Sequence, residues 1–256
     1  MPHNPPSYRI VIPARYGSRR LPGKPLLPVA GQPLIWHVYQ AARRSAAHEI
    51  VIATDDARIA EAARGFGAHV CLTCPDHLSG TDRLAEVAVQ CGWADDDLVV
   101  NLQGDEPEMP PELPDQVAQE LVGHPDAAMA TLAAPITQAA EHTDPAVVKV
   151  VTNQAGMALY FSRASLPWQH DAEAALLPAR RRHIGIYAYR VSLLHRYTTW
   201  PSSPLEQAES LEQLRALWYG EKIRVGIAHQ VPPPGIDTAD DYAQLLTRTG
   251  TASCMS

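Results

Sequence analysis

The sequence is short of several features that would define a membrane-embedded, secreted or zinc-binding protein. It has no run of about 18 apolar residues, so no membrane-spanning helix is predicted. Residues 1–7 lack the charged and apolar regions of a signal peptide, which predicts a cytoplasmic protein. Of the four cysteines, Cys71 and Cys74 form one C-x-x-C pair, but a zinc site would need a second matching pair. We therefore expect reduced thiols, the usual state of cytosolic cysteine.

An excess of basic residues is also absent, because 21 Lys and Arg stand against 28 Asp and Glu. The net charge of −7 argues against nucleic acid and membrane surfaces as partners, since both select a basic face. With 256 residues, of which 46% are hydrophobic and 19% charged, the chain can bury one sizeable core. A single α/β domain is predicted.

Apolar runs alternate with helical patterns through the first half of the chain. The predicted strands are 10–12, 50–53, 69–72 and 98–102, and the predicted helices are 34–44, 57–66, 82–91 and 112–122. Crossovers of this length predict a mostly parallel sheet with helices on both faces. The carboxyl ends of its strands then share one edge, where such sheets bind ligands.

The pattern changes at about residue 135, where strands at 147–151, 158–161 and 184–189 follow one another, with a loop predicted at 172–182. This arrangement predicts an inserted β-rich subdomain. One helix over 204–218, a strand over 223–228 and a helix over 238–247 then return the chain to the core. Residues 250–256 are predicted to form a frayed tail.

A basic loop follows the first strand, with Arg15, Arg19, Arg20 and Lys24 inside ten residues. It is not a Walker A loop, because five residues separate Gly17 from Gly23 and a proline follows Lys24. It also lacks the dinucleotide fingerprint G-x-G-x-x-G. A loop between a strand and a helix suits phosphate oxygens, so we expect a polyphosphate there. The alternative is a solvated basic turn.

Two acidic segments are candidates for a magnesium site. Asp105 and Glu106 follow the strand at 98–102, and Asp237 precedes the last helix. Carboxylate oxygens are ligands that Mg²⁺ prefers, often together with substrate phosphates. The alternatives are a turn aspartate at Asp105 and a helix N-cap at Asp237 or Thr238.

Other polar residues stand where they could contact a small ligand. Glu209, Glu212 and Gln213 would share one face of the helix at 204–218, which begins with a capping box at Ser203, although a solvated face is the default reading. Arg163 and His183 are cations at strand boundaries, suited to a carboxylate. The turn at 79–83 either caps a helix through Ser79 or reaches a nucleotide.

The loop matches the pattern A-R-x-x-S-x-R-x-P-x-K of sugar-activating cytidylyltransferases at residues 14–24. The chain as a whole, from about residue 7 to 248, resembles the 3-deoxy-manno-octulosonate (Kdo) cytidylyltransferase family. The segments that carry this resemblance are residues 14–25, 76–81, 101–107, 158–168, 182–187, 203–206, 211–222 and 235–238. Residues 211–222, LEQLRALWYGEK, are not a pattern shared by cytidylyltransferases in general.

The resemblance implies a Rossmann-like nucleotidyltransferase fold of one domain over residues 1–256, with a core at 7–134 and 201–248. Residues about 135–200 would form an inserted β-rich dimerisation subdomain of a homodimer. The implied reaction joins CTP and Kdo to give CMP-Kdo and diphosphate, for lipopolysaccharide biosynthesis. The alternatives are a cytidylyltransferase for another acidic sugar, such as a sialic acid, and a nucleotide-binding regulatory protein without turnover.

The resemblance also implies a role for each matching residue. The nucleotide would be bound by Ala14, Arg15, Ser18, Arg20, Lys24, Ser79, Thr81 and Arg83. Kdo would be bound by Gln103, Arg163, His183, Tyr187, Glu212 and Gln213. Asp105 and Asp237 would hold Mg²⁺, and together with Arg15 and Lys24 they would form the catalytic set.

Overall fold

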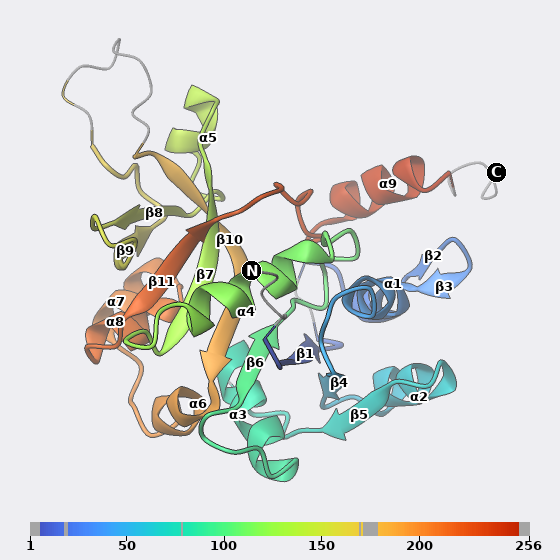
Figure 1. The fold of residues 1–256 in the computed structure, drawn as a ribbon. Helices are drawn as coiled ribbons and strands as arrows, with labels where there is room; N and C mark the ends of the chain where they lie inside the picture. Colours follow the sequence, from blue (N-terminus) through green and yellow to red (C-terminus); the bar gives the residue numbers. More distant parts are fainter. Residues whose placement is uncertain (1–5, 18–19, 78, 169, 171–178, 251–256) are drawn as a thin grey trace, which may run out of the picture.

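The computed structural model describes residues 6–17, 20–77, 79–168, 170 and 179–250. Its first half alternates strands and helices as the sequence predicts (Figure 1). The elements are β1 (Arg9–Ala14), η1 (Lys24–Leu26), β2 (Pro28–Val29), β3 (Gln32–Pro33), α1 (Leu34–Ala42), β4 (Glu49–Thr54), α2 (Ala57–Gly65), β5 (His69–Leu72), α3 (Gly80–Gln90), β6 (Leu98–Asn101) and α4 (Glu112–Val122).

The second half of the chain continues the mixture of strands and helices. It contains β7 (Met129–Pro135), α5 (Ala139–Thr143), β8 (Lys149–Thr152), β9 (Ala158–Ser162), β10 (Arg181–Arg190), α6 (Val191–Tyr197), α7 (Pro204–Glu209), α8 (Gln213–Trp218), β11 (Ile223–Ile227) and α9 (Ala239–Arg248). None of the helices in the described ranges is long and apolar enough to cross a bilayer.

One large sheet organises the molecule, with its main strands in the order β11-β7-β10-β6-β1-β4-β5. Strands β4, β1 and β6 pair in parallel, as do β4 with β5 and β7 with β11. Strand β10 runs antiparallel between β6 and β7. The predicted mostly parallel α/β architecture is therefore confirmed, with one antiparallel strand at its centre.

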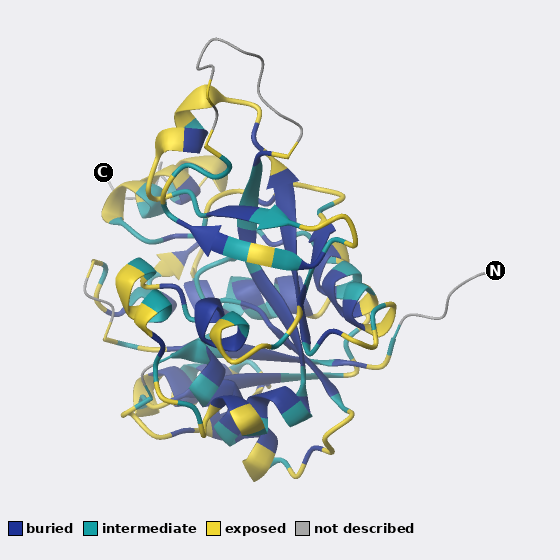
Figure 2. Cartoon of the chain, turned by 90° about the vertical axis from the view of Figure 1, so that its left-hand side faces the viewer, coloured by how far each residue is buried: buried dark blue, intermediate teal, exposed yellow. Residues whose placement is uncertain are grey.

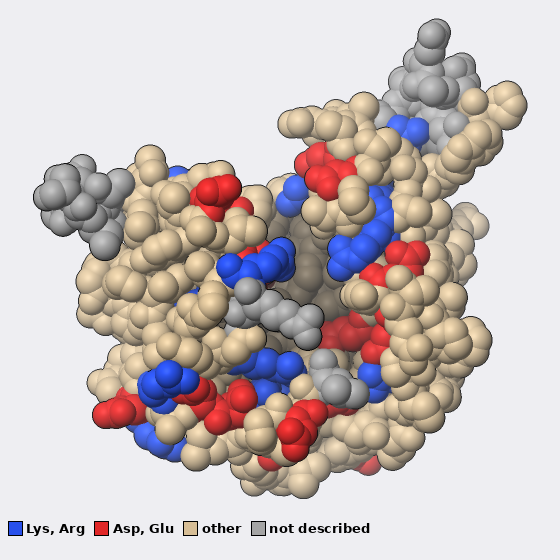
Figure 3. Space-filling view, turned by 180° about the vertical axis from the view of Figure 1, so that it is seen from behind, with Lys and Arg blue, Asp and Glu red and all other residues tan. Residues whose placement is uncertain are grey.

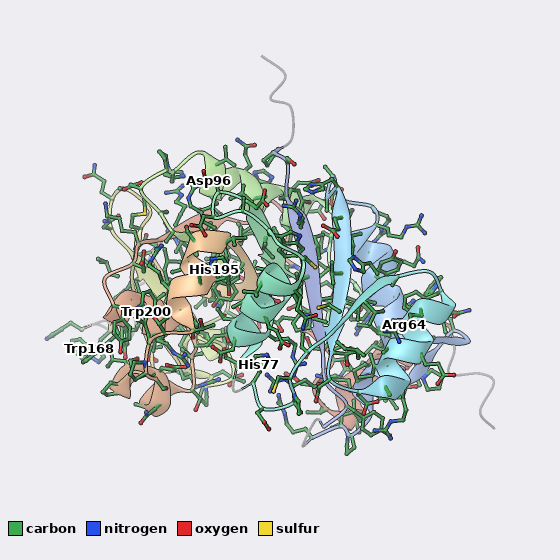
Figure 4. All side chains as sticks on the ribbon, turned by 90° about the horizontal axis from the view of Figure 1, so that it is seen from below. Arg64, His77, Asp96, Trp168, His195 and Trp200 are labelled. Atoms are coloured by element: carbon green, nitrogen blue, oxygen red, sulfur yellow. The ribbon has the colours of Figure 1, made fainter. Side chains whose placement is uncertain are left out.

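Helices cover both faces of this sheet. Ile10 and Ile12 of β1 belong to an apolar cluster with residues of α1, α2 and α4, whereas Val11 packs on the other side with residues of α3, α6 and α8. Alternate residues of a strand point to opposite faces, so a strand between two helical layers is apolar on both. Figure 2 shows the strands dark blue between helices with exposed outer sides. On one of these faces, helices α3 and α6 contact each other. Helix α6 contains His195, which is labelled in Figure 4.

The segment predicted as an insertion lies partly outside and partly inside the central layers. Strands β8 and β9 pair with each other, and β8 also pairs with the first two residues of β10. The rest of β10 and the following α6 belong to the central layers. Strand β10 thus belongs to the central sheet although it lies within the predicted insertion, whose boundary near residue 200 stays a prediction. The predicted loop at 172–182 overlaps the first two residues of β10, and residues 171–178 lie outside the described part of the chain.

The predicted helix at 204–218 is two helices in the structure. Helix α7 ends at Glu209, because Ser210 takes a left-handed conformation with φ of 53°, and α8 starts at Gln213. A serine gives a weaker signal for such a stop than the glycine that usually occupies it. Strand β7 was not predicted either, since its sequence MATLAAP is rich in alanine, which has a low strand propensity.

Helix α9 returns to the beginning of the chain. Ile236 and Leu245 pack with Val29 and Leu34, and the Tyr242 hydroxyl donates a hydrogen bond to the Pro28 carbonyl at 2.5 Å. This small apolar cluster brings the residues before α9 beside the basic loop.

Candidate active site

A cavity of about 290 Å³ opens at the carboxyl ends of β1 and β6, where parallel sheets bind ligands. Figure 3 shows a hollow on this face with Lys and Arg side chains on its sides. The walls approach closely at Gly104, where a Cβ atom would lie 2.6 Å from the Pro13 carbonyl oxygen. Its lining includes Ala14, Arg15, Gly17, Lys24, Ser79, Gly80, Gln103 and Asp105.

Lys24 lines this cavity and lies between the two predicted metal ligands, Asp105 and Asp237. Its Nζ donates to Asp105 Oδ2 at 2.6 Å and to Asp237 Oδ1 at 3.3 Å. Arg20 Nη2 lies 2.9 Å from the same Asp237 oxygen. Two carboxylates that are distant in the sequence therefore converge on one ammonium group whose side chain is only 11% exposed.

Backbone contacts explain this convergence. The Ile236 N–H donates to the Asp105 carbonyl at 2.8 Å, which joins the two acidic segments directly. The N-cap of α9 is Thr238, in a capping box with Asp241. The alternative of Asp237 as the cap is therefore wrong, and the side chain of Asp237 is left to interact with Lys24 and Arg20.

Glu106, which belongs to the same predicted acidic segment as Asp105, is also part of the site, although the sequence assigned it no role of its own. One oxygen of its carboxyl, Oε2, is buried and has no hydrogen-bond partner among the described residues. Burial, together with the charges of Asp105 and Asp237, raises the pKa of Glu106 to about 8. At neutral pH the Glu106 carboxyl is therefore mostly protonated, and the charges of Asp105 and Asp237 are matched by those of Lys24 and Arg20.

The fit to Mg²⁺ rests on Asp105 and Asp237. No group of three or more His, Cys, Asp or Glu side chains within the described ranges is arranged to hold a metal ion. Magnesium commonly takes only one or two carboxylates and completes its coordination with water and substrate phosphates. Two converging carboxylates beside a basic loop match that donor set.

A second cavity, of about 410 Å³, adjoins the first and shares Gln103 and Asp105 with it. Its walls come from the ends of β6 and β9, from β10, and from the turn between α7 and α8. All six residues predicted to bind the sugar line it: Gln103, Arg163, His183, Tyr187, Glu212 and Gln213. The structure thus brings the six together, and their individual roles stay predictions.

His183 is neutral, which corrects its prediction as a cation. Burial lowers the pKa of its imidazole to about 3. Its Nε2 lies 2.9 Å from Thr131 Oγ1, and that hydroxyl has the carbonyls of Ile184 and Ile186 as acceptors. Nε2 therefore donates to Thr131 and Nδ1 is left as the acceptor of the ring.

Two other titratable groups that line this cavity have raised pKa values. Burial raises the pKa of the Tyr187 hydroxyl and of the Glu212 carboxyl. Arg163 is the one cation among the residues that line the second cavity in the described chain. This combination suits a polyhydroxylated ligand that carries a single negative group.

Glu209 is separated from Glu212 and Gln213 by the break at Ser210, so the predicted shared face does not exist. Its carboxylate instead accepts from Ser162 Oγ at 2.5 Å and from the Arg163 N–H at 2.9 Å.

Not all predicted nucleotide ligands reach the first cavity. Ala14, Arg15, Lys24 and Ser79 line it, and Arg15 Nη2 donates to the Ser79 carbonyl at 3.1 Å. Arg83 is fully buried, 3.2 Å from Asp55 and hydrogen-bonded to Thr73. Thr81 is buried as well, with its hydroxyl 3.3 Å from that of Tyr189. The side chains of Arg83 and Thr81 are therefore buried and do not line the first cavity, and their role toward the nucleotide stays a prediction.

Two more of the predicted nucleotide ligands are Ser79 and Ser18. Ser79 is the N-cap of α3, in a capping box with Asp82, which agrees with the cap interpretation of that turn. Ser18, a predicted nucleotide ligand, lies outside the described residues.

Comparison with known families agrees with this geometry. The sequence profile of the family described as "Cytidylyltransferase" matches residues 9–223. The chain therefore belongs to the cytidylyltransferase family.

Individual relatives narrow the family. The chain is 57% identical over 245 residues to the 3-deoxy-manno-octulosonate cytidylyltransferase of Pseudomonas syringae pv. tomato, with 93% of this chain and 96% of that protein covered. It is 50% identical over 251 residues to the one of Pasteurella multocida, with 93% and 97% covered. The chain thus groups with the 3-deoxy-manno-octulosonate cytidylyltransferases.

Solved structures show the same relation. A CMP:2-keto-3-deoxy-manno-octonic acid synthetase complexed with CTP superposes with a TM-score of 0.88 at 44% identity, covering 96% of this chain and 100% of that one. A nucleotidyl transferase from Methanothermobacter has a TM-score of 0.57 at 15% identity, which supports the fold alone.

Proposed function

We propose that this protein transfers CMP from CTP to the anomeric hydroxyl of Kdo, releasing diphosphate, and so supplies CMP-Kdo for lipopolysaccharide biosynthesis. The observation that carries the proposal is the pair of adjoining cavities. One has the basic loop and the other has the six predicted sugar ligands, and they meet at Gln103 and Asp105.

The reaction is an in-line displacement at the α-phosphorus of CTP. The sugar oxygen forms a new bond to phosphorus while the bond to the diphosphate oxygen breaks, and the hydroxyl loses its proton. In the transition state, negative charge is redistributed over the phosphate oxygens. Positioning of the substrates and neutralisation of this charge therefore supply most of the rate acceleration. Arg15, Arg20 and Lys24 would provide cations for the triphosphate. Ser18 would also bind the nucleotide.

Asp105 and Asp237 would hold Mg²⁺, which when bound neutralises phosphate charge and lowers the pKa of a coordinated hydroxyl. The same two carboxylates contact Lys24. Binding of the triphosphate gives Lys24 and Arg20 new anionic partners, which leaves the carboxylates available to the metal.

The acceptor site follows from the second cavity. Arg163 would bind the carboxylate of Kdo, and the neutral groups would bind its hydroxyls. His183 accepts through Nδ1, whereas Gln103 and Gln213 both donate and accept. No covalent enzyme intermediate is needed, because the two adjoining cavities would place the sugar hydroxyl beside the α-phosphorus of CTP.

We also propose a homodimer that acts in the cytoplasm. Strand β9 pairs only with β8 among the described strands, and its Leu159 is 61% exposed. Exposed apolar edges are typical contact surfaces between subunits. The free thiols of Cys71, Cys74 and Cys91 suit a reducing compartment.

The test is release of diphosphate from CTP with a panel of acidic sugars. We expect turnover with Kdo, a preference for CTP over the other nucleoside triphosphates, and a requirement for Mg²⁺. Turnover with a sialic acid but not with Kdo would replace the acceptor. Nucleotide binding without turnover on any acceptor would favour a regulatory protein.

A further inference from the structure

Arg163 lies at the end of β9 and lines the second cavity with much of its hydrogen-bonding capacity already used. Its Nε donates to the Glu209 carbonyl at 2.9 Å, and its Nη1 donates to the Pro145 carbonyl at 3.1 Å. No hydrogen bond to the described residues uses Nη2. The guanidinium is thus held by two backbone carbonyls, with one nitrogen left for a ligand.

Glu209 holds Arg163 at more than one point. Besides the carbonyl that accepts from Nε, its carboxylate accepts from the Arg163 N–H at 2.9 Å and from Ser162 Oγ at 2.5 Å. Both the backbone and the side chain of Arg163 are therefore fixed by one residue. Glu209 itself does not line the second cavity.

The break between α7 and α8 makes this contact available. Carbonyl groups in the last turn of a helix have no partner within the helix. Because Ser210 is left-handed, the chain turns at this point, and the residues that follow it, Leu211, Glu212 and Gln213, line the same cavity as Arg163. The turn that fixes Arg163 is thus continuous with the opposite wall of the cavity.

Lys149 supports the other side of Arg163. It is fully buried, and its Nζ donates to the carbonyls of Asp144, Val147 and Arg163 at 2.7, 2.6 and 2.6 Å. A buried ammonium group is costly unless it is fully hydrogen-bonded, so these three carbonyls are tied firmly together. The segment between Asp144 and Val147 includes Pro145, the acceptor of Nη1.

We propose that Glu209 is a positioning residue that fixes Arg163 so that its free Nη2 binds the carboxylate of the acidic sugar. The inference rests on the proposed function, because it assigns the ligand of Arg163 within that site. Glu209 acts on the sugar only through Arg163, and the triphosphate loop lies on the other side of Gln103 and Asp105. The KM for the sugar therefore depends on Glu209 and the KM for CTP does not.

The experiment compares steady-state kinetics of Glu209→Ala and Glu209→Gln with the parent. We expect Glu209→Ala to raise the KM for Kdo about tenfold or more, with kcat and the KM for CTP changed less than about twofold. Glu209→Gln keeps one oxygen acceptor, so its KM for Kdo is expected to lie between that of the parent and that of Glu209→Ala. Glu221→Ala is the matched control, since Glu221 binds Arg196 on the surface away from both cavities.

A double-mutant cycle with Arg163→Ala separates positioning from general support. If Glu209 acts through Arg163, Glu209→Ala adds little to the KM for Kdo in the Arg163→Ala background. Equal increases in both KM values, additive effects in the cycle, or an unchanged KM for Kdo would overturn the inference. If Glu209→Ala does not fold, the Glu209→Gln kinetics decide by the same criteria.

Kinetics of the parent protein distinguish a failure of this inference from a failure of the proposed function. Turnover of Kdo by the parent together with a silent Glu209→Ala variant refutes the inference alone. A parent that does not turn over Kdo refutes the proposed function and the inference with it.

Discussion

At Lys24 a single ammonium group binds two carboxylates, Asp105 and Asp237, that lie far apart in the sequence. Its position in the basic loop that would hold the triphosphate predicts a large kinetic effect of Lys24→Ala. We expect kcat/KM to fall by about 10²–10³, because no neutral neighbour replaces its charge on the phosphate oxygens. The thermal melt should remain cooperative.

The control for Lys24→Ala is Lys222→Ala, which removes an exposed lysine paired with Asp126. Near-normal kcat/KM in a folded Lys24→Ala protein would show that the basic loop is only a solvated turn.

Asp105 and Asp237 are predicted to act together on Mg²⁺. Asp→Asn at either position keeps the size of the side chain and removes the anionic oxygen, so we expect kcat to fall about 100-fold or more. Binding of Mn²⁺ to the CTP complex, measured by electron paramagnetic resonance, should weaken in parallel. Asp240→Asn changes an exposed carboxylate in the first turn of α9 and should match the parent.

The outcome for Asp237→Asn is decisive because Thr238 is the helix cap. A variant with parental rate and unchanged Mg²⁺ dependence would remove Asp237 from the metal site, leaving Asp105 as its one assigned ligand.

His183 predicts a pH dependence of stability. The pKa of its ring is about 3 in the folded protein and near 6.5 in the unfolded chain, so below pH 6.5 the unfolded state binds the extra proton. Its contribution to stability is complete above pH 6.5 and is lost progressively as the pH falls toward 3, by about 2 kcal/mol at pH 5. Melting temperatures at pH 7.5 and 5 should differ less in His183→Gln than in the parent. Parallel losses in the two proteins would contradict the assignment.

Among the elements, α9 shows how a helix end can direct a side chain outside the helix. Thr238 Oγ1 accepts from the Asp241 N–H at 3.2 Å, while Asp241 Oδ2 accepts from the N–H groups of Thr238 and Asp237 at 2.8 and 3.0 Å. This capping box fixes the backbone of Asp237 and leaves its carboxylate to face Lys24.

Thr238→Ala is therefore expected to affect both stability and activity. Loss of a helix cap costs about 1 kcal/mol, and kcat/KM should fall because Asp237 is less well fixed. Thr238→Ser keeps the hydroxyl and should restore both. Loss of stability with unchanged kcat/KM would show that the cap does not position Asp237.

The arrangement of the whole molecule leaves β9 as an outer strand, and Trp168 stands out at the edge of the same region (Figure 4). We expect light scattering at micromolar concentration to give about twice the chain mass of 27.9 kDa. Leu159→Asp places a charge on the exposed face of β9 and should give a monomer with an unchanged circular dichroism spectrum. A monomeric mass for the parent would refute the proposed dimer.

The periodic parts of the fold could be predicted from the sequence. Helix α4 has a clear spacing of apolar residues, because a helix buried on one face must repeat them at fixed intervals. Strand β4 instead shows a continuous apolar run, because both of its faces are buried. Strand β7 and the break at Ser210 could not be found in this way. An alanine-rich strand is stabilised by the strands on either side of it, and a left-handed serine by the contacts of the helices around it.

The sequence by itself determined which chemical groups are available: the cations of the basic loop, Asp105 and Asp237, and the polar residues of the second cavity. Only the tertiary structure decided which of them meet and in what state. It buries Arg83 and Thr81 outside the first cavity, makes His183 neutral by desolvation, and turns the Glu209 carboxylate toward the Arg163 N–H rather than into the second cavity. The physical reason is that proximity and burial arise from sheet order and from the packing of α9 on the first residues of the chain, which no local pattern encodes.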